Sequence, residues 1–374
     1  MNITVAEVFS PGEHLREELE ARGWTQEEFA EIIGRSYKQV NELLGAKATL
    51  TAPMAAVIAS ALGTSPELWL NLENAYRLSL AEPVSRDIER RGRLRSEFPV
   101  REMQKRGWIS KEKGVDELER SVYDFFAVSA PNQLSPYASA AKRASYDGAL
   151  TRAQEAVLLR VRQLAQLVQA APYSENALRS CIERLKELRA DPEQARHVPK
   201  LLADVGVRFV VCEPFPGSKL DGICTWLDAQ SPVIGMTLRL DRIDNFWFVL
   251  RHEIEHVLRR DGLVNGEPGA VIDEDVSDLA GDELAGAEVA ANTAAAEFCV
   301  STDAMQNFMD SVGPLYSKAK VLGFAMMQGV HPGIVVGQLQ RRLNRWDLFR
   351  PMLARIREVI TSVAVTDGYG RIVA

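Results

Sequence analysis

The sequence predicts an α+β protein, with an all-α N-terminal domain, a helical linker and a C-terminal domain that contains a small sheet. Three observations predict this fold class. Short helices separated by glycines fill the first 80 residues, helical periodicity gives way to strand periodicity near residue 200, and a His-Glu-x-x-His helix follows the strands. At about 150 residues per domain, the 374 residues form two or three domains. We expect boundaries at 1–80, 81–194 and 195–374.

Composition excludes several classes of protein. No window approaches 18 consecutive apolar residues, and the N-terminus lacks the basic and apolar regions of a signal peptide. The 4 cysteines form no Cys-x-x-Cys pair, which disfavours a disulfide scaffold and a cysteine zinc site. We therefore expect a cytoplasmic protein with reduced thiols and no membrane partner. The net charge of −7 argues mildly against an extensive nucleic-acid-binding surface.

The N-terminal domain is expected to contain five helices, each with a recognisable start. Thr25 with Glu28, and Ser36 with Gln39, have the spacing of capping boxes. The other helices are expected to begin near Glu13 and after Thr51 and Ser65, the last two with a proline in the first turn.

The second and third helices are separated only by a short break at Gly34-Arg35, which predicts a helix-turn-helix whose third helix enters the major groove of DNA. Ala30 is small where the helices cross, and Gly34 suits a positive φ. Gln and Asn side chains can pair with adenine, Lys with guanine or phosphate, and flanking basic residues with phosphates. The side chains that we expect to contact DNA are Arg35, Ser36, Tyr37, Lys38, Gln39, Asn41 and Lys47.

A plain helical bundle is the alternative. Residues 1–80 carry six basic and eleven acidic residues, whereas DNA-binding modules are usually basic. The segments at 11–19 and 63–72, however, resemble HigA-like antitoxins of the XRE-type helix-turn-helix class. The resemblance covers roughly residues 8–78. It implies a homodimeric repressor that binds operator DNA and, in such systems, a cognate toxin as a partner.

The linker region begins with a basic segment at 86–106, which we interpret as a solvated linker or an exposed helix. Strands are expected at 205–211, 220–227 and 233–238, and helices at 244–260 and 285–300. An Asp-Gly turn at 367–368 predicts a terminal hairpin between 362–366 and 369–373.

The motif at 252–256 predicts a zinc (Zn2+) site. The i, i+4 spacing places His252 and His256 on one helix face, and Glu253 is positioned to act as a general base. A catalytic zinc needs a third protein ligand, for which we favour Glu288 on the next long helix. The competing donors are Glu255, Glu283 and Glu297.

Three further residues have expected roles around this site. Asn292 lies one turn after Glu288 and could accept a hydrogen bond from a ligating imidazole. His331 and Tyr316 are candidate donors to the transition state, although the alternative for His331 is a helix-start residue near the site.

The same motif, the segment at 288–292 and the segments at 98–108, 331–337 and 367–370 resemble the ImmA/IrrE family of metallo-endopeptidases. The resemblance implies a zincin-like C-terminal domain that cleaves a protein substrate, a repressor or an antitoxin. Two alternatives stay open. The histidines could be a surface pair without metal, or the half could bind zinc without proteolysis, as a sensor or dimerisation module of an antitoxin-like repressor.

Overall fold

The computed structural model describes residues 8–82, 84–111, 114–133, 135–136, 150–264, 266–274 and 286–371. Contacts divide the chain into two compact units, Met1–Arg86 and Asp87–Ala374. The division falls six residues after the expected boundary at 80. Residues 87–194, expected to be a linker, belong to the same compact unit as the sheet.

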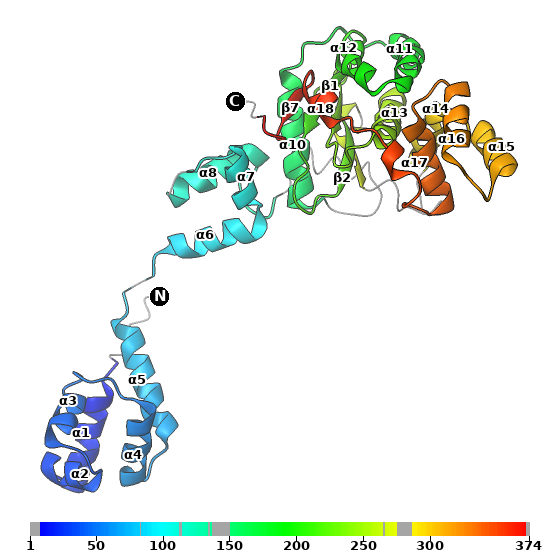
Figure 1. The fold of residues 1–374 in the computed structure, drawn as a ribbon. Coiled ribbons are helices and arrows are strands. Elements are labelled where there is room, and N and C mark those ends of the chain that lie inside the picture. The colour runs from blue at the N-terminus through cyan, green and yellow to red at the C-terminus, as the bar shows by residue number, and fades with distance from the viewer. Residues whose placement is uncertain are drawn as a thin grey trace. The chain divides into compact units, whose positions relative to one another are not determined.

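In the described residues of the first unit, five helices pack around one core (Figure 1). These are α1 (Pro11–Arg22), α2 (Gln26–Ile32), α3 (Tyr37–Leu44), α4 (Ala52–Leu62) and α5 (Pro66–Leu80). Its centre contains Phe29, Val40, Ile58 and Trp69, each at most 2 % exposed.

The predicted helix starts are present in this unit. Thr25 and Ser36 form the two expected capping boxes, and Ser10 forms a third with Glu13. Each such cap contributes about 1 kcal/mol to helix stability. Thr51 is the N-cap of α4, but its side chain forms no capping hydrogen bond. The start of α4 is therefore favoured only by the proline in its first turn.

The second unit combines a five-stranded sheet with helices. Before the sheet come α6 (Arg86–Glu97), α7 (Val100–Arg106), α8 (Val115–Phe126), α10 (Arg152–Gln166), α11 (Glu175–Glu187) and α12 (Val198–Ala203). After the third strand come α13 (Ile243–Arg259), α14 (Gly286–Cys299), α15 (Thr302–Val312), α16 (Lys318–Met327), α17 (Pro332–Leu343) and α18 (Arg357–Thr361). Short 3-10 turns lie at Leu188–Ala190, Pro192–His197 and Arg350–Met352.

The sheet has the strand order β6-β2-β3-β1-β7. The three predicted strands are present as β1 (Arg208–Cys212), β2 (Leu220–Trp226) and β3 (Pro232–Met236). β1 is parallel to β3, and β2 is antiparallel to β3 and to the outer strand β6 (Ala270–Glu274). β6 was not predicted, and neither was the small pair β4 (Leu263–Val264) and β5 (Glu267–Pro268).

The predicted terminal hairpin is not formed in the described residues, and 372–373 of its second strand lie outside them. β7 (Val365–Asp367) pairs with β1 in parallel, and only one isolated bridge joins Gly368 to Arg371 across the turn. The buried carboxylate of Asp367 forms an ion pair with Arg160 and accepts a hydrogen bond from Trp108. These long-range contacts hold β7 at the edge of the sheet, next to β1.

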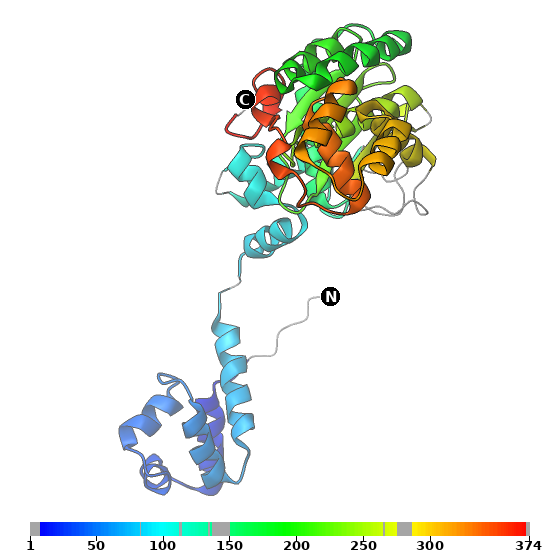
Figure 2. The ribbon, with the colours of Figure 1, turned by 45° about the vertical axis from the view of Figure 1, so that its right-hand side comes forward.

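Helices cover both faces of this sheet (Figure 1). Val210 and Cys212 of β1 pack into a core with α8 and α10, whereas the alternate residues Phe209 and Val211 pack into a core with α13. Figure 2 shows the same layers from a second side. This three-layer arrangement places α13, with the His-Glu-x-x-His motif, directly against the sheet.

Within the described ranges, no single helix is long and apolar enough to cross a membrane. The helices α16 and α17, which are bent by 114° relative to each other, reach that length and apolar composition only when they are taken together.

Candidate functional site

The first candidate site is the exposed side of α3. Residues 33–36 join α2 to α3, and Gly34 has the predicted positive φ, at 64°. Ala30 is buried at the crossing of the two helices, and Val40 and Leu43 anchor α3 to the core. This short connection between two packed helices is the geometry of a helix-turn-helix.

All the side chains predicted to contact DNA are exposed to solvent: Arg35, Ser36, Tyr37, Lys38, Gln39, Asn41 and Lys47. Two of them also maintain the helix start. The Gln39 backbone N–H donates to Ser36 Oγ at 3.3 Å, and Gln39 Oε1 accepts from the Ser36 backbone N–H at 3.1 Å. The Gln39 amide oxygen therefore already accepts hydrogen bonds from Ser36. Its NH2 group is the donor with which Gln39 could contact a DNA base.

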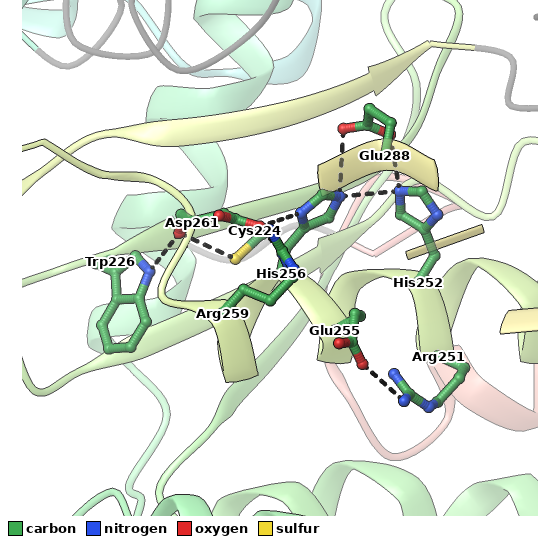
Figure 3. Close-up of polar contacts among 9 residues, drawn as sticks. All are labelled: Cys224, Trp226, Arg251, His252, Glu255, His256, Arg259, Asp261 and Glu288. Atoms are coloured by element: carbon green, nitrogen blue, oxygen red, sulfur yellow. Dashed lines mark hydrogen bonds and ion pairs between the residues drawn. The ribbon is translucent and has the colours of Figure 1, made fainter. Parts of the chain in front are cut away.

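The second candidate site lies on α13. The side of this helix that faces the sheet is apolar, and it buries the motif so deeply that His252, Glu253 and His256 are each 0 % exposed. The next helix, α14, packs against α13 and brings Glu288 to the two imidazoles (Figure 3). The Glu288 side chain remains 23 % exposed, so the cluster has one side open to solvent.

The three side chains present a triangle of ligand atoms. The two Nε2 atoms are 3.0 Å apart, and each lies 3.4 Å from a carboxylate oxygen of Glu288. A tetrahedral zinc ion with bonds of 2.0–2.1 Å needs ligand atoms about 3.3 Å apart. The triangle fits that requirement, and two imidazoles with one carboxylate are a ligand set that catalytic zinc uses. The residues present therefore fit a zinc ion.

Asp261 orients one of these imidazoles, and the sequence reasoning missed it. Its Oδ2 lies 2.9 Å from His256 Nδ1, which favours the tautomer with the proton on Nδ1 and leaves Nε2 as the ligand atom (Figure 3). The Asp261 backbone oxygen accepts hydrogen bonds from Trp226 Nε1 and Cys224 Sγ on β2. The sequence does contain a signal for this role, because Asp261 is a carboxylate that follows the end of the motif helix within two residues.

Glu253 lies against the backbone of β2. A Cβ atom at Gly222 would overlap its carboxylate, so the absence of a side chain there makes room for the predicted base. Gly222 was not predicted as a site residue because a glycine inside a strand gives no sign of which side chain approaches it.

The competing carboxylates have other partners. Glu255 forms an ion pair with Arg251 at 2.8 Å (Figure 3), and Glu297 accepts a hydrogen bond from the Thr302 backbone at 2.8 Å. Hydrogen bonds from Thr302 lower the pKa of Glu297, with a smaller effect from the charge of Arg342. Glu283 lies outside the described residues.

Of the three predicted supporting residues, Asn292 lacks its expected contact, and His331 and Tyr316 have other contacts. The buried Oδ1 of Asn292 has no hydrogen-bond partner in the described part of the chain, so it does not accept from an imidazole. His331 is the N-cap of α17, where its Nδ1 accepts from the Gly333 backbone at 3.0 Å, and burial lowers the pKa of its imidazole. Tyr316 lies between α15 and α16, with its ring 6.3 Å from that of Phe308. Their role as transition-state donors stays a prediction.

A cavity of about 430 Å³ lies beside α13, at Phe248. α13, α14 and α17 contribute its walls, which include Phe248, Asn292 and Arg341. The Phe248 ring stacks beside the His252 ring, with the ring centres 6.4 Å apart and the planes at 28°. The cavity therefore begins one side chain away from a candidate zinc ligand.

Comparisons with known proteins match the first unit. The helix-turn-helix family model matches residues 15–69. An uncharacterised HTH-type transcriptional regulator of Escherichia coli (strain K12), YddM, is 37% identical over 84 residues, which are 22% of this chain and 88% of YddM. The antitoxin HigA-1 of Vibrio cholerae is 43% identical over 70 residues, 18% of this chain and 66% of the antitoxin.

A crystal structure from Nostoc punctiforme, described as a candidate antidote protein of a plasmid maintenance system, is 31% identical and covers 20% of this chain and 82% of its own, with a TM-score of 0.20. The matched residues 15–69 contain α2, α3 and the seven exposed side chains described above. Through its first unit, the chain belongs to the helix-turn-helix family of DNA-binding transcriptional regulators, in which it is similar to HigA antitoxins.

Proposed function

We propose that the chain is a cytoplasmic, operator-binding repressor whose second unit is a zinc-dependent endopeptidase that cleaves a regulatory protein, a repressor or an antitoxin. One observation carries the peptidase part: the triangle of His252, His256 and Glu288, with its 3.0 and 3.4 Å edges, beside the carboxylate of Glu253. A helix surface pair without metal would not need a third ligand from another helix.

The residues around the triangle have separate tasks in this proposal. Bound zinc would lower the pKa of a coordinated water to about 7 and polarise the scissile carbonyl. Asp261 holds His256 in the ligating tautomer, and Gly222 leaves room for Glu253. Glu253 would take the proton from the attacking water and return it to the leaving amine, which is the role of a general base and acid.

The test uses the purified full chain and two substitutions. His252→Ala should lose stoichiometric zinc, measured by inductively coupled plasma mass spectrometry. Glu253→Gln should retain zinc and lower cleavage by about 10²- to 10⁴-fold, because it removes the base and leaves the ligands. Cleavage is read as new N-termini, identified by mass spectrometry in an extract of host proteins. Equal cleavage by wild type and Glu253→Gln would refute the mechanism.

The DNA-binding role is proposed for a homodimer, the form that palindromic operators select. A gel-shift series with the chain's own promoter region should give an affinity that falls with salt, with a log–log slope of about −0.9 for each phosphate contacted. Absence of a shift at low salt would remove the repressor role. A cognate toxin is the proposed further partner, tested by co-expression with the neighbouring genes and gel filtration.

The burial of the motif favours a second candidate function. The side chains of His252 and His256 are 0 % exposed, as the ligands of structural zinc sites usually are, and only Glu288 reaches solvent. In this alternative, the second unit is a zinc-binding sensor or dimerisation module of an antitoxin-like repressor. Stoichiometric zinc without any new N-termini, together with DNA binding or dimerisation that changes when zinc is chelated, would favour it.

A further inference from the structure

The imidazole of His252 lies between two other rings. The Phe248 ring lies beside it, with the ring centres 6.4 Å apart and the planes at 28°. The His256 ring meets it more nearly edge-on, with the centres 4.7 Å apart and the planes at 68°. All three residues belong to α13 and are spaced four apart, so the helical period places them on one face of the helix.

A histidine that ligates a metal needs its ring held in one rotation. The torsion that turns an imidazole about its Cβ–Cγ bond has broad minima, so neighbouring groups must fix the direction in which Nε2 points. For His256 that neighbour is Asp261, 2.9 Å from Nδ1. For His252 it is the nearly parallel Phe248 ring, because an imidazole that turned away from this orientation would lose the offset-stacked contact.

Phe248 is itself contacted from another helix. The guanidinium carbon of Arg341, on α17, lies 5.0 Å from the centre of the Phe248 ring, which is within the range of a cation–π contact. The helices α13 and α17 also pack against each other. The spacing of Phe248 and His252 is therefore set by the sequence of α13, whereas the contact on Phe248 from Arg341 depends on the packing of α17.

We propose that Phe248 is a positioning residue of the candidate zinc site, whose ring holds the His252 imidazole in its ligating rotation. In that rotation, His252 Nε2 lies 3.0 Å from His256 Nε2 and 3.4 Å from a carboxylate oxygen of Glu288. The inference rests on the proposed zinc site, and it does not require proteolysis. The two histidines of the triangle are then oriented by different groups, a carboxylate for His256 and an aromatic ring for His252.

The experiment measures metal binding by the full chain and makes no use of cleavage. Phe248→Leu removes the ring and keeps an apolar side chain. Its zinc affinity, measured by competition with a chromophoric chelator at neutral pH, should fall by about three- to tenfold, the effect expected for the loss of one aromatic contact. The visible bands of bound Co²⁺, which report the geometry of the ligands, should also change. Phe248→Tyr retains the ring and should keep the wild-type affinity and bands.

Phe324→Leu is the matched control, because it removes a ring from another stacked pair of the same unit. The rings of Phe324 and Phe308 have their centres 4.3 Å apart and their planes at 10°. This variant should lower the free energy of unfolding and leave the zinc affinity and the Co²⁺ bands as in the wild type. Urea unfolding of every variant shows whether zinc affinity merely follows global stability. If Phe248→Leu does not fold, Phe248→Met takes its place, because a flexible methionine fills irregular gaps in a core.

The outcomes separate this inference from the proposed function. Weaker zinc binding and altered Co²⁺ bands in Phe248→Leu, with recovery in Phe248→Tyr and no change in Phe324→Leu, support the positioning role, even if the wild-type chain cuts no protein. Wild-type affinity in Phe248→Leu, no recovery in Phe248→Tyr, or an equal loss in Phe324→Leu overturns the role and leaves the zinc proposal intact. A wild-type chain that binds neither Zn²⁺ nor Co²⁺ overturns both.

Discussion

The α carbon of Gly222 faces the carboxylate of Glu253, and a Cβ atom at this position would overlap both that carboxylate and Val249, so any side chain here requires Glu253 to move. The candidate base thus owes its position to a residue that is distant in sequence and has no side chain.

Gly222→Ala should therefore displace Glu253 while leaving the zinc ligands in place. We expect cleavage to fall by at least tenfold, because a displacement of about 1 Å can cost 100-fold in rate, while zinc stoichiometry stays unchanged. Generation of new N-termini and zinc content are the two measurements. Gly217→Ala, in the preceding turn, has no neighbour within 4 Å, although its φ of 80° strains any side chain, so it controls for instability. If both variants cleave equally well, the packing of Gly222 does not position the base.

Asp261→Ala should weaken zinc binding by about 10- to 100-fold, which is the usual effect of removing a carboxylate that orients a ligating imidazole. Asp261→Asn should have a smaller effect, because its amide oxygen can still accept from His256 Nδ1. Competition with a chromophoric chelator at neutral pH measures the affinity. Glu187→Gln, an exposed substitution on α11, serves as the control for a lost negative charge. Unchanged affinity in Asp261→Ala would show that the 2.9 Å contact is not used for metal binding.

Gln39 has two assigned roles that substitution can separate. Gln39→Glu keeps the acceptor of the capping box with Ser36, so the free energy of unfolding should stay within about 0.5 kcal/mol of the wild type. The same change removes the NH2 donor and adds a negative charge facing DNA, so operator affinity should fall by about tenfold or more. Asn74→Asp, at an exposed position of α5, adds the same charge and should have a smaller effect on operator affinity. Gel shifts and urea unfolding are the measurements, and equal affinity for the wild type and Gln39→Glu would exclude a base contact.

Two of the buried cysteines, Cys212 and Cys299, make the stability of the fold depend on alkaline pH. Burial raises the pKa of each thiol to about 12, well above the ordinary value of a cysteine. The folded state therefore keeps both thiols protonated where the unfolded state would ionise them. Their contribution to stability is complete below pH 9 and falls between pH 9 and 12, by about 1 kcal/mol per thiol for each pH unit.

Urea unfolding of the wild type and of Cys212→Ala at pH 7.5 and 10 tests this sign. The loss of stability between the two pH values should be about 1 kcal/mol smaller in the variant, because one ionising group is absent. Native protein at pH 8 should also resist a thiol reagent at both residues until it unfolds. Rapid labelling of Cys212 in the native chain would show that the residue is not enclosed.

Local rules account for what the sequence alone determined. The capping pairs Thr25–Glu28 and Ser36–Gln39 begin helices where predicted, since a cap depends on residues three apart. The short break between the second and third helices predicted the helix-turn-helix. The helical period predicted that His252 and His256 share one face of their helix. The three strands after residue 205 were found within three residues of their bounds. Each of these features is encoded within one segment of chain.

Tertiary structure decided the relations between distant segments. The Asp-Gly turn predicted a hairpin, but β7 pairs with β1 about 155 residues away, because the edge of the sheet and the Arg160 ion pair stabilise it there. Four glutamates competed as the third ligand, and the packing of α14 on α13 brought Glu288 to the histidines. Asp261, Gly222 and the cavity near α17 had no clear local signal. Spacing along one helix is enough to place His252 and His256 on the same face. The approach of α14 with Glu288, and of β2 with Gly222, depends on how the helices pack on the faces of the sheet.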